Sequence, residues 1–185
     1  MARLIHLNGP PGIGKSTLAQ VYVDGHPGVL NLDIDKVRAL IGGWRDRFDE
    51  AGQLARSLAL GMAGAHLREG HDVIVPQYLG RLGEIERFEA VAVGSGAMFC
   101  EVVLMADKEQ SLRRFANRSA AGELAWHRQV QEVVDSHGGP QLLAEMYDRL
   151  AEAMQRRPTA VVIPSEDGAI SQTYEAFLTA VEASC

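Results

Sequence analysis

Short runs of apolar residues alternate along the chain with longer segments in which apolar residues recur every three or four positions. The short runs predict strands and the longer segments predict helices. Strands are expected at residues 3–8, 28–32, 72–76, 97–105 and 159–163. Helices are expected near residues 16–24, 35–41, 50–68, 83–93, 108–117, 125–136, 141–156 and 170–183. This alternation is typical of an α/β fold in which helices flank a five-stranded parallel sheet.

The length and charge of the chain narrow the classes of protein. With 185 residues, we expect residues 1–185 to form a single α/β domain. The formal net charge is −6, so no overall basic field attracts nucleic acid or an anionic membrane, and only a local basic groove would do so. No 18-residue apolar stretch and no signal-peptide pattern is found. We therefore expect a cytoplasmic protein without membrane contact and do not expect nucleic acid as a partner.

A glycine-rich motif directly follows the first expected strand. Residues 9–17 read GPPGIGKST and match the Walker A pattern G-x-x-x-x-G-K-[ST]. Glycines allow successive N–H groups to turn inward around a phosphate, and the following helix directs its positive end at the same anion. The expected nucleotide-binding residues are Gly9, Pro10, Pro11, Gly12, Ile13, Gly14, Lys15, Ser16 and Thr17.

Two side chains of this motif carry specific chemistry. Lys15 reaches the β- and γ-phosphates and is expected to act in catalysis, whereas the Ser16 hydroxyl is the expected protein ligand of Mg²⁺. The motif therefore predicts binding of a nucleoside triphosphate, with ATP and Mg²⁺ as the expected cofactors. The guanine-selecting N-K-x-D and the transporter signature L-S-G-G-Q are both missing, and the chain is short for a ring-forming ATPase. A small kinase is the favoured class.

The segment after the second expected strand supports a kinase. Residues 31–38 read NLDIDKVR and place two carboxylates and an arginine where a strand passes into a helix. Ligands of such sheets bind beyond the carboxyl ends of the strands, so this segment and the phosphate loop face one crevice. Asp35 can accept the proton of an acceptor hydroxyl, and Arg38 can hold an anionic part of the acceptor or the transferred phosphoryl group. Alternatively, Asp33 or Asp35 is a helix cap and Arg38 a surface cation.

The strand, the phosphate loop and the segment NLDIDKVR resemble the small P-loop kinases, which include polynucleotide 5′-kinases, gluconate kinases and chloramphenicol phosphotransferase. The polynucleotide kinase pattern N-x-x-x-D-x-x-R corresponds to Asn31, Asp35 and Arg38, and it implies a general base and a contact with the acceptor phosphate. The middle of the chain resembles the tunicamycin-resistance proteins in VIVPQ at 73–77, LMADKE at 104–109, two arginines of the next helix and the region of Trp126. This resemblance implies a sheet with strand order 2-3-1-4-5.

One position departs from many relatives of this class. Their third strand ends in an aspartate that helps to organise Mg²⁺, whereas here the strand runs into Pro76 and Gln77. A neutral amide cannot supply that charge. Mg²⁺ is then expected to rest on Ser16, the phosphates and waters, with Asp33 as an outer-sphere partner.

Arginines after the fourth expected strand form a second group. Arg113, Arg114 and Arg118 lead into residues 119–123, a small and polar segment with the composition of a mobile lid. An arginine that closes over the triphosphate stabilises charge and excludes water. Arg118 is the expected catalytic and nucleotide-binding residue of this lid, followed by Arg114 as a nucleotide-binding residue. Alternatively, this helix presents a solvated charged face.

The acceptor is expected to contact Asp33, Arg38, Trp44, Gln77 and Tyr78, and Trp126 with His127 are weaker candidates. Aromatic side chains offer an apolar face with a polar handle for a sugar, base or drug, although each taken alone is also compatible with packing.

The sequence therefore predicts an ATP-dependent phosphotransferase that acts on a hydroxyl of a small molecule, such as an antibiotic or a nucleoside-like compound. The alternative within enzymes is a nucleoside or polynucleotide 5′-kinase. The alternative from another class is an ATP-binding regulatory switch without a small-molecule acceptor, which Gln77 keeps open.

Overall fold

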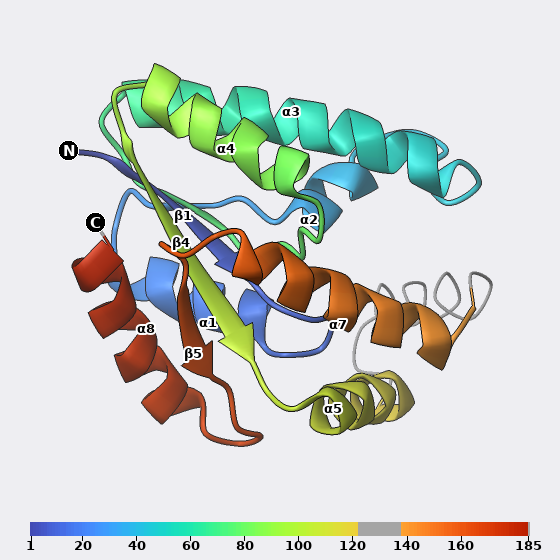
Figure 1. Ribbon diagram of the computed structural model, residues 1–185. Coiled ribbons are helices and arrows are strands. Elements are labelled where there is room, and N and C mark those ends of the chain that lie inside the picture. The colour runs from blue at the N-terminus through green and yellow to red at the C-terminus, as the bar shows by residue number, and fades with distance from the viewer. Residues whose placement is uncertain (122–137, 185) are drawn as a thin grey trace.

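The computed structural model, which describes residues 1–121 and 138–184, contains a five-stranded parallel sheet (Figure 1). The strand order is β2-β3-β1-β4-β5, which confirms the expected order 2-3-1-4-5. The register places Ile5 beside Ile74 of β3 and Cys100 of β4. The strands are β1 Arg3–Asn8, β2 Leu30–Asn31, β3 Val73–Val75, β4 Met98–Met105 and β5 Val161–Pro164.

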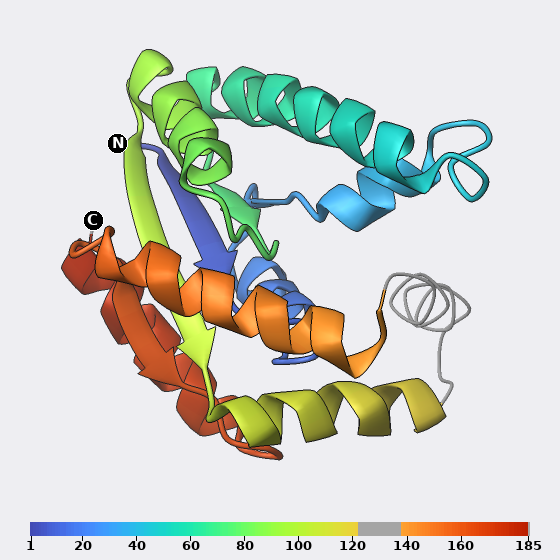
Figure 2. The same ribbon diagram turned by 45° about the vertical axis from the view of Figure 1, so that its right-hand side comes forward.

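Helices cover both faces of this sheet (Figures 1 and 2). They are α1 Lys15–Gly25, α2 Ile34–Ala39, α3 Phe48–Arg68, α4 Leu82–Gly94, α5 Lys108–Ala121, α7 Pro140–Gln155 and α8 Ile170–Ser184. The helix expected at 125–136 lies outside the described residues. Within the part of the chain that is described, no helix has the length and apolar composition of a membrane span.

The two faces of the sheet pack against different helices because successive strand residues point to opposite sides. On one side, Leu4 and Val75 are buried against α3 and α4. On the other side, Ile5 and Leu7 are buried against α1 and α8. Burial on both faces explains why the strands read as continuous apolar runs. All strands are parallel, so the loops that follow β1 and β2 leave the same edge of the sheet, where the sequence predicts a crevice.

Two boundaries differ from the expected ones for physical reasons. The second strand was expected over residues 28–32, but β2 has only Leu30 and Asn31, since Gly28 adopts a positive φ of 91° that is incompatible with a regular strand. The first part of the expected lid, residues 119–121, is helical and extends α5 to Ala121. Ser and Ala are compatible with a helix, so their small size alone did not indicate a break. Residues 122 and 123 of the expected lid lie outside the described residues.

A buried charged network lies beside β1 and β4. The Glu101 carboxylate accepts a hydrogen bond of 2.8 Å from Arg157 Nε, and its other oxygen lies 3.6 Å from His6 Nδ1. Arg157 also donates to Glu89 at 2.7 Å. Burial opposes the ionisation of Glu101, but the hydrogen bonds and charges of His6 and Arg157 outweigh it and hold the pKa of Glu101 below its ordinary value of 4.5.

Replacing Glu101 with glutamine is expected to lower the free energy of unfolding by about 1–3 kcal/mol at pH 7, because the partly buried Arg157 loses a charged partner. A carboxylate whose pKa is lowered by folding stabilises the protein above its unfolded pKa, and this contribution is lost as the pH falls through its folded pKa. The difference between wild type and Glu101→Gln should therefore shrink below pH 4.5. Denaturant unfolding at a series of pH values measures it. Glu89→Gln, which changes a carboxylate nearer the surface, is the control and should have a smaller effect. A difference between wild type and Glu101→Gln that does not change with pH would contradict the lowered pKa of Glu101.

Candidate active site

The phosphate loop connects β1 to α1 and depends on glycine at two close approaches. Gly9 has a φ of 147°, and a Cβ there would lie 2.6 Å from the Leu104 carbonyl oxygen. Gly12 has a φ of 83°, and a Cβ there would lie 3.0 Å from the Phe115 backbone. Both positions combine a backbone conformation that side chains rarely adopt with contact to a neighbouring backbone. The loop is therefore packed between β4 and α5.

The first turn of α1 is open to an anion. Its N-cap is Gly14, and no side chain caps the free N–H groups of this turn. The side chain of Lys15 is largely buried, and its Nζ donates to the carbonyl oxygens of Gly9 at 2.8 Å and Pro10 at 2.9 Å. The helix end and the lysine thus concentrate positive charge where the motif predicts phosphate binding.

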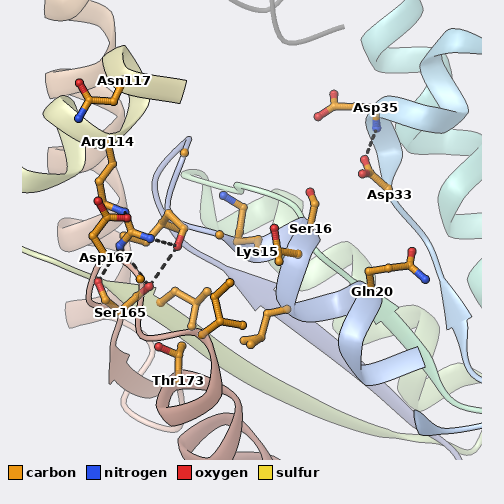
Figure 3. Close-up of a pocket in the computed structure, with 18 of the residues that line it drawn as sticks. Lys15, Ser16, Gln20, Asp33, Asp35, Arg114, Asn117, Ser165, Asp167 and Thr173 are labelled. Carbon is orange, nitrogen blue, oxygen red and sulfur yellow. Dashed lines mark hydrogen bonds and ion pairs between the residues drawn. The ribbon is translucent and has the colours of Figure 1, made fainter. Parts of the chain in front are cut away.

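A cavity of about 1030 Å³ opens in front of this loop (Figure 3). One wall is formed by α1 and α2, which contribute Ser16, Gln20 and Asp35. The opposite wall is formed by α5 and the segment between β5 and α8, which contribute Arg114 and Ser165. Residues 12–17 of the expected phosphate site line this cavity, whereas Gly9, Pro10 and Pro11 do not, and the carbonyls of Gly9 and Pro10 accept hydrogen bonds from Lys15.

Asp33 and Asp35 lie together at the start of α2. Asp33 is the N-cap, and its carboxylate accepts a hydrogen bond of 3.0 Å from the Asp35 N–H. Asp35 lies in the first turn and pairs with Arg38 at 2.9 Å. Both carboxylates line the cavity. The capping interpretation thus applies to Asp33, while the Asp35 carboxylate is oriented by an arginine.

Arg38 occupies a different place from the one that the sequence suggested. Its side chain is buried, and the guanidinium carbon lies 4.2 Å from the centre of the Phe48 ring. It is neither a surface cation nor a residue that lines the cavity. The neighbouring Lys36 does line the cavity, as does Trp44 from the loop before α3.

Arg114 connects three parts of the site (Figure 3). It donates to the Ser165 carbonyl at 2.7 Å and to the Ile13 carbonyl at 3.1 Å, and its Nε lies 3.7 Å from the Asp167 carboxylate. The expected nucleotide-binding arginine is therefore on the cavity wall, where it joins α5 to the phosphate loop and to the segment after β5. Arg118 lies in the last turns of α5, but its side chain is not among those described.

Gln77 and Tyr78, which were expected to contact the acceptor, do not line the cavity in the described residues. The Tyr78 hydroxyl donates to the Met146 carbonyl at 2.9 Å, and burial raises the pKa of Tyr78 to about 12. The carbonyl of Gln77 lies 3.1 Å from His6 Nε2. Asn8 bonds both the N–H and the carbonyl of Leu79. These contacts fix the loop after β3 to β1 and α7. The weaker candidates, Trp126 and His127, lie outside the described residues.

Sequence reasoning missed the wall contributed by the segment between β5 and α8. Ser165, Asp167 and Thr173 all line the cavity, and the Ser165 hydroxyl donates to the Ile13 carbonyl at 3.1 Å. The sequence did contain a signal for this wall. The polar segment SEDG at 165–168 follows the fifth expected strand, at the sheet edge where ligands of parallel sheets bind.

The fold and this cavity together define a P-loop kinase-like protein. A family model described as an AAA domain (AAA_33) matches residues 4–140, so the chain belongs to this family. No curated protein sequence matches the chain.

Solved structures support the same fold. The chain is similar to the tunicamycin resistance protein of Deinococcus radiodurans, with a TM-score of 0.63 and 20% identity over 97% of this chain and 95% of that one. It is also similar to a gluconokinase from Sinorhizobium meliloti 1021, with a TM-score of 0.60 and 16% identity over 97% and 91% of the two chains. A chain of the Pnkp1/Rnl/Hen1 RNA repair complex gives a TM-score of 0.60 and 14% identity over 84% of this chain and 46% of that one. At sequence identities of 20% or less, this structural similarity establishes the fold alone.

Proposed function

We propose that this protein transfers the γ-phosphate of ATP to a hydroxyl group of a small molecule. One observation carries the proposal: a single cavity joins the phosphate-loop residues Lys15 and Ser16 to the carboxylate of Asp35. Phosphoryl transfer requires the triphosphate and the acceptor to share one enclosed space in line with each other. The kinase-like fold supports a phosphotransferase in general.

The nucleotide and the acceptor are assigned to opposite ends of the cavity. The phosphates bind at the phosphate loop and the N-terminus of α1, where positive charge is concentrated. The acceptor lies beside α2, where Asp33 and Asp35 are found, so the nucleoside extends toward the segment after β5. There Ser165 and Thr173 offer hydroxyl groups to it.

The residues of the loop fit a magnesium ion bound together with the triphosphate. The Ser16 hydroxyl and the Asp33 carboxylate both line the cavity. No group of three or more His, Cys, Asp and Glu side chains that could hold a metal occurs in the described parts of the chain. This composition suits Mg²⁺, which keeps waters and binds through one or two protein groups plus substrate phosphates. The ion would neutralise charge on the phosphates.

The proposed step uses Asp35 as the general base. Its carboxylate accepts the proton of the acceptor hydroxyl while the new oxygen–phosphorus bond forms and the bond from the γ-phosphorus to the bridging oxygen of ADP breaks. Lys15 stabilises the charge on the phosphates during transfer. Arg38 is a positioning residue, because its ion pair with Asp35 at 2.9 Å orients the carboxylate. Arg114 keeps the phosphate loop and the opposite wall together.

The position of Arg38 favours a small acceptor over a polynucleotide. An arginine that bound an acceptor phosphate would have to face the cavity, whereas this guanidinium is buried against Phe48 and paired with Asp35. The net charge of −6 also opposes binding of a polyanion. The Trp44 ring and the Asp33 carboxylate suit a hydroxylated compound with an apolar face. A nucleoside-like compound and an antibiotic both have this chemistry.

The decisive experiment measures phosphate transfer from labelled ATP to a panel of nucleosides, oligonucleotides, sugars and antibiotics. We expect a labelled product with a small hydroxylated acceptor and none with an oligonucleotide. Labelling of the oligonucleotide alone would favour a polynucleotide 5′-kinase. Tight ATP binding without transfer to any acceptor would favour a regulatory switch.

A further inference from the structure

The outer face of α3 carries a row of exposed apolar side chains. Leu54, Leu58 and Met62 are 49%, 52% and 41% exposed, and their spacing of four residues aligns them on one side of the helix. In both views α3 lies on the outside of the molecule, with the sheet beneath it and α4 beside it (Figures 1 and 2). No described element covers this row.

The surface around the row is uncharged over a long distance. Between Glu50 and Arg68, the exposed positions of α3 are Gln53, Leu54, Ser57, Leu58, Gly61, Met62 and Ala65. The one charged arginine in this interval, Arg56, is turned toward α4, where its Nε lies 3.6 Å from the Glu84 carboxylate. A surface helix normally presents charged residues to water, so an uncharged exposed face indicates a binding surface.

Small residues beside the apolar row make this surface complementary to itself. Ser57, Gly61 and Ala65 recur every four residues along the same face. A Cβ at Gly61 would have no heavy atom within 4 Å, so the space above it is open to a side chain from outside. Large and small positions side by side allow the leucines of one helix to enter the gaps of another.

Charges at the two ends determine the direction of the pairing. Glu50 and Arg68 are separated by about five helical turns and therefore lie on the same face, at opposite ends of the uncharged surface. A parallel copy of α3 would place like charges together, whereas an antiparallel copy places each glutamate opposite an arginine. Glu50 pairs with Arg47 in an exposed ion pair of the kind that contributes little to stability.

We propose that α3 packs antiparallel against α3 of a second copy of this chain, with the two-fold axis near Ala59. Each copy then contributes the same surface, as a two-fold dimer requires. Leu54 and Leu58 of one copy lie against Gly61 and Ala65 of the other, and Glu50 lies opposite Arg68 of the second copy. The inference is independent of the proposed function.

Sedimentation of the full chain across a range of concentrations tests the dimer. We expect a weak dimer with a dissociation constant of about 1–100 µM. Leu58→Glu should raise this constant at least about tenfold, because two carboxylates would be buried near the axis. Val162→Glu is the matched control, since Val162 is 53% exposed but lies on β5, and it should leave association unchanged. A wild-type protein that is monomeric throughout, or a dimer unaffected by Leu58→Glu, overturns the proposal.

Three further variants test whether a loss of association comes from the interface and not from unfolding, and whether the two helices are antiparallel. Gly61→Gln improves the helix propensity of α3 but fills the gap, so it should raise the melting temperature of the monomer and weaken association. Arg68→Glu should weaken association, and adding Glu50→Arg should restore it by exchanging the charges. A double variant that associates no better than Arg68→Glu rules out the antiparallel pairing.

Discussion

Replacing Lys15 with alanine is expected to slow phosphoryl transfer strongly and to weaken ATP binding while the fold is retained. Lys15 is the first residue of α1, and its Nζ lies within 2.9 Å of two backbone carbonyls of the phosphate loop. Removing one preorganised group that stabilises developing charge costs about 10²–10³-fold in turnover. Calorimetry with ATP and single-turnover transfer by the folded variant measure both effects.

The control for this variant is Lys108→Ala. Lys108 is held by an acidic partner, Asp148 at 2.7 Å, whereas Lys15 is held by backbone carbonyls, and Lys108 is exposed and lies outside the cavity. Its ion pair is of the exposed type that contributes about 0–1 kcal/mol to stability, so ATP binding should not change. Unchanged ATP affinity together with unchanged turnover in Lys15→Ala would remove the phosphate-loop assignment.

The phosphate loop could be predicted from the sequence because its signal is local. Gly9, Gly12 and Gly14 occur in one short stretch between an apolar run and a helix, and the structure requires glycine at these positive φ values. The strand order was also correct, but it came from a resemblance to known kinases. The positions of apolar runs along the chain do not determine which strands are neighbours in a sheet.

The side-chain arrangement of the site could not be predicted, because it depends on contacts between distant parts of the chain. Arg38 is buried against Phe48, which belongs to the next helix, and does not line the cavity. Arg114 is directed by the Ser165 carbonyl, 51 residues further along the chain. Tyr78 is directed by Met146 of α7. In each case the local sequence indicated only the type of residue, and tertiary packing decided where its side chain lies.

The Asp35→Asn variant is expected to bind ATP as the wild type does and to transfer phosphate about 10²–10⁴-fold more slowly, the usual contribution of a general base. Asparagine keeps the size of the side chain and can still accept a hydrogen bond from Arg38, so α2 should keep its structure. The Asp33 cap, which accepts from the backbone N–H of residue 35, is untouched. The measurement is single-turnover transfer to the acceptor that the panel identifies, with ATP affinity measured in parallel.

Asp107→Asn is the matched control for this change. Asp107 also lies at a helix start, where it accepts a hydrogen bond of 2.8 Å from the Gln110 N–H, but it does not line the cavity. Its substitution should leave transfer near the wild-type rate. If Asp35→Asn also transfers at that rate, Asp35 is only a structural residue of α2, and Asp33, the other carboxylate beside the acceptor space, becomes the candidate base. If Asp35→Asn instead loses ATP binding, the carboxylate acts on the nucleotide, and the division of the cavity into a nucleotide end and an acceptor end is wrong.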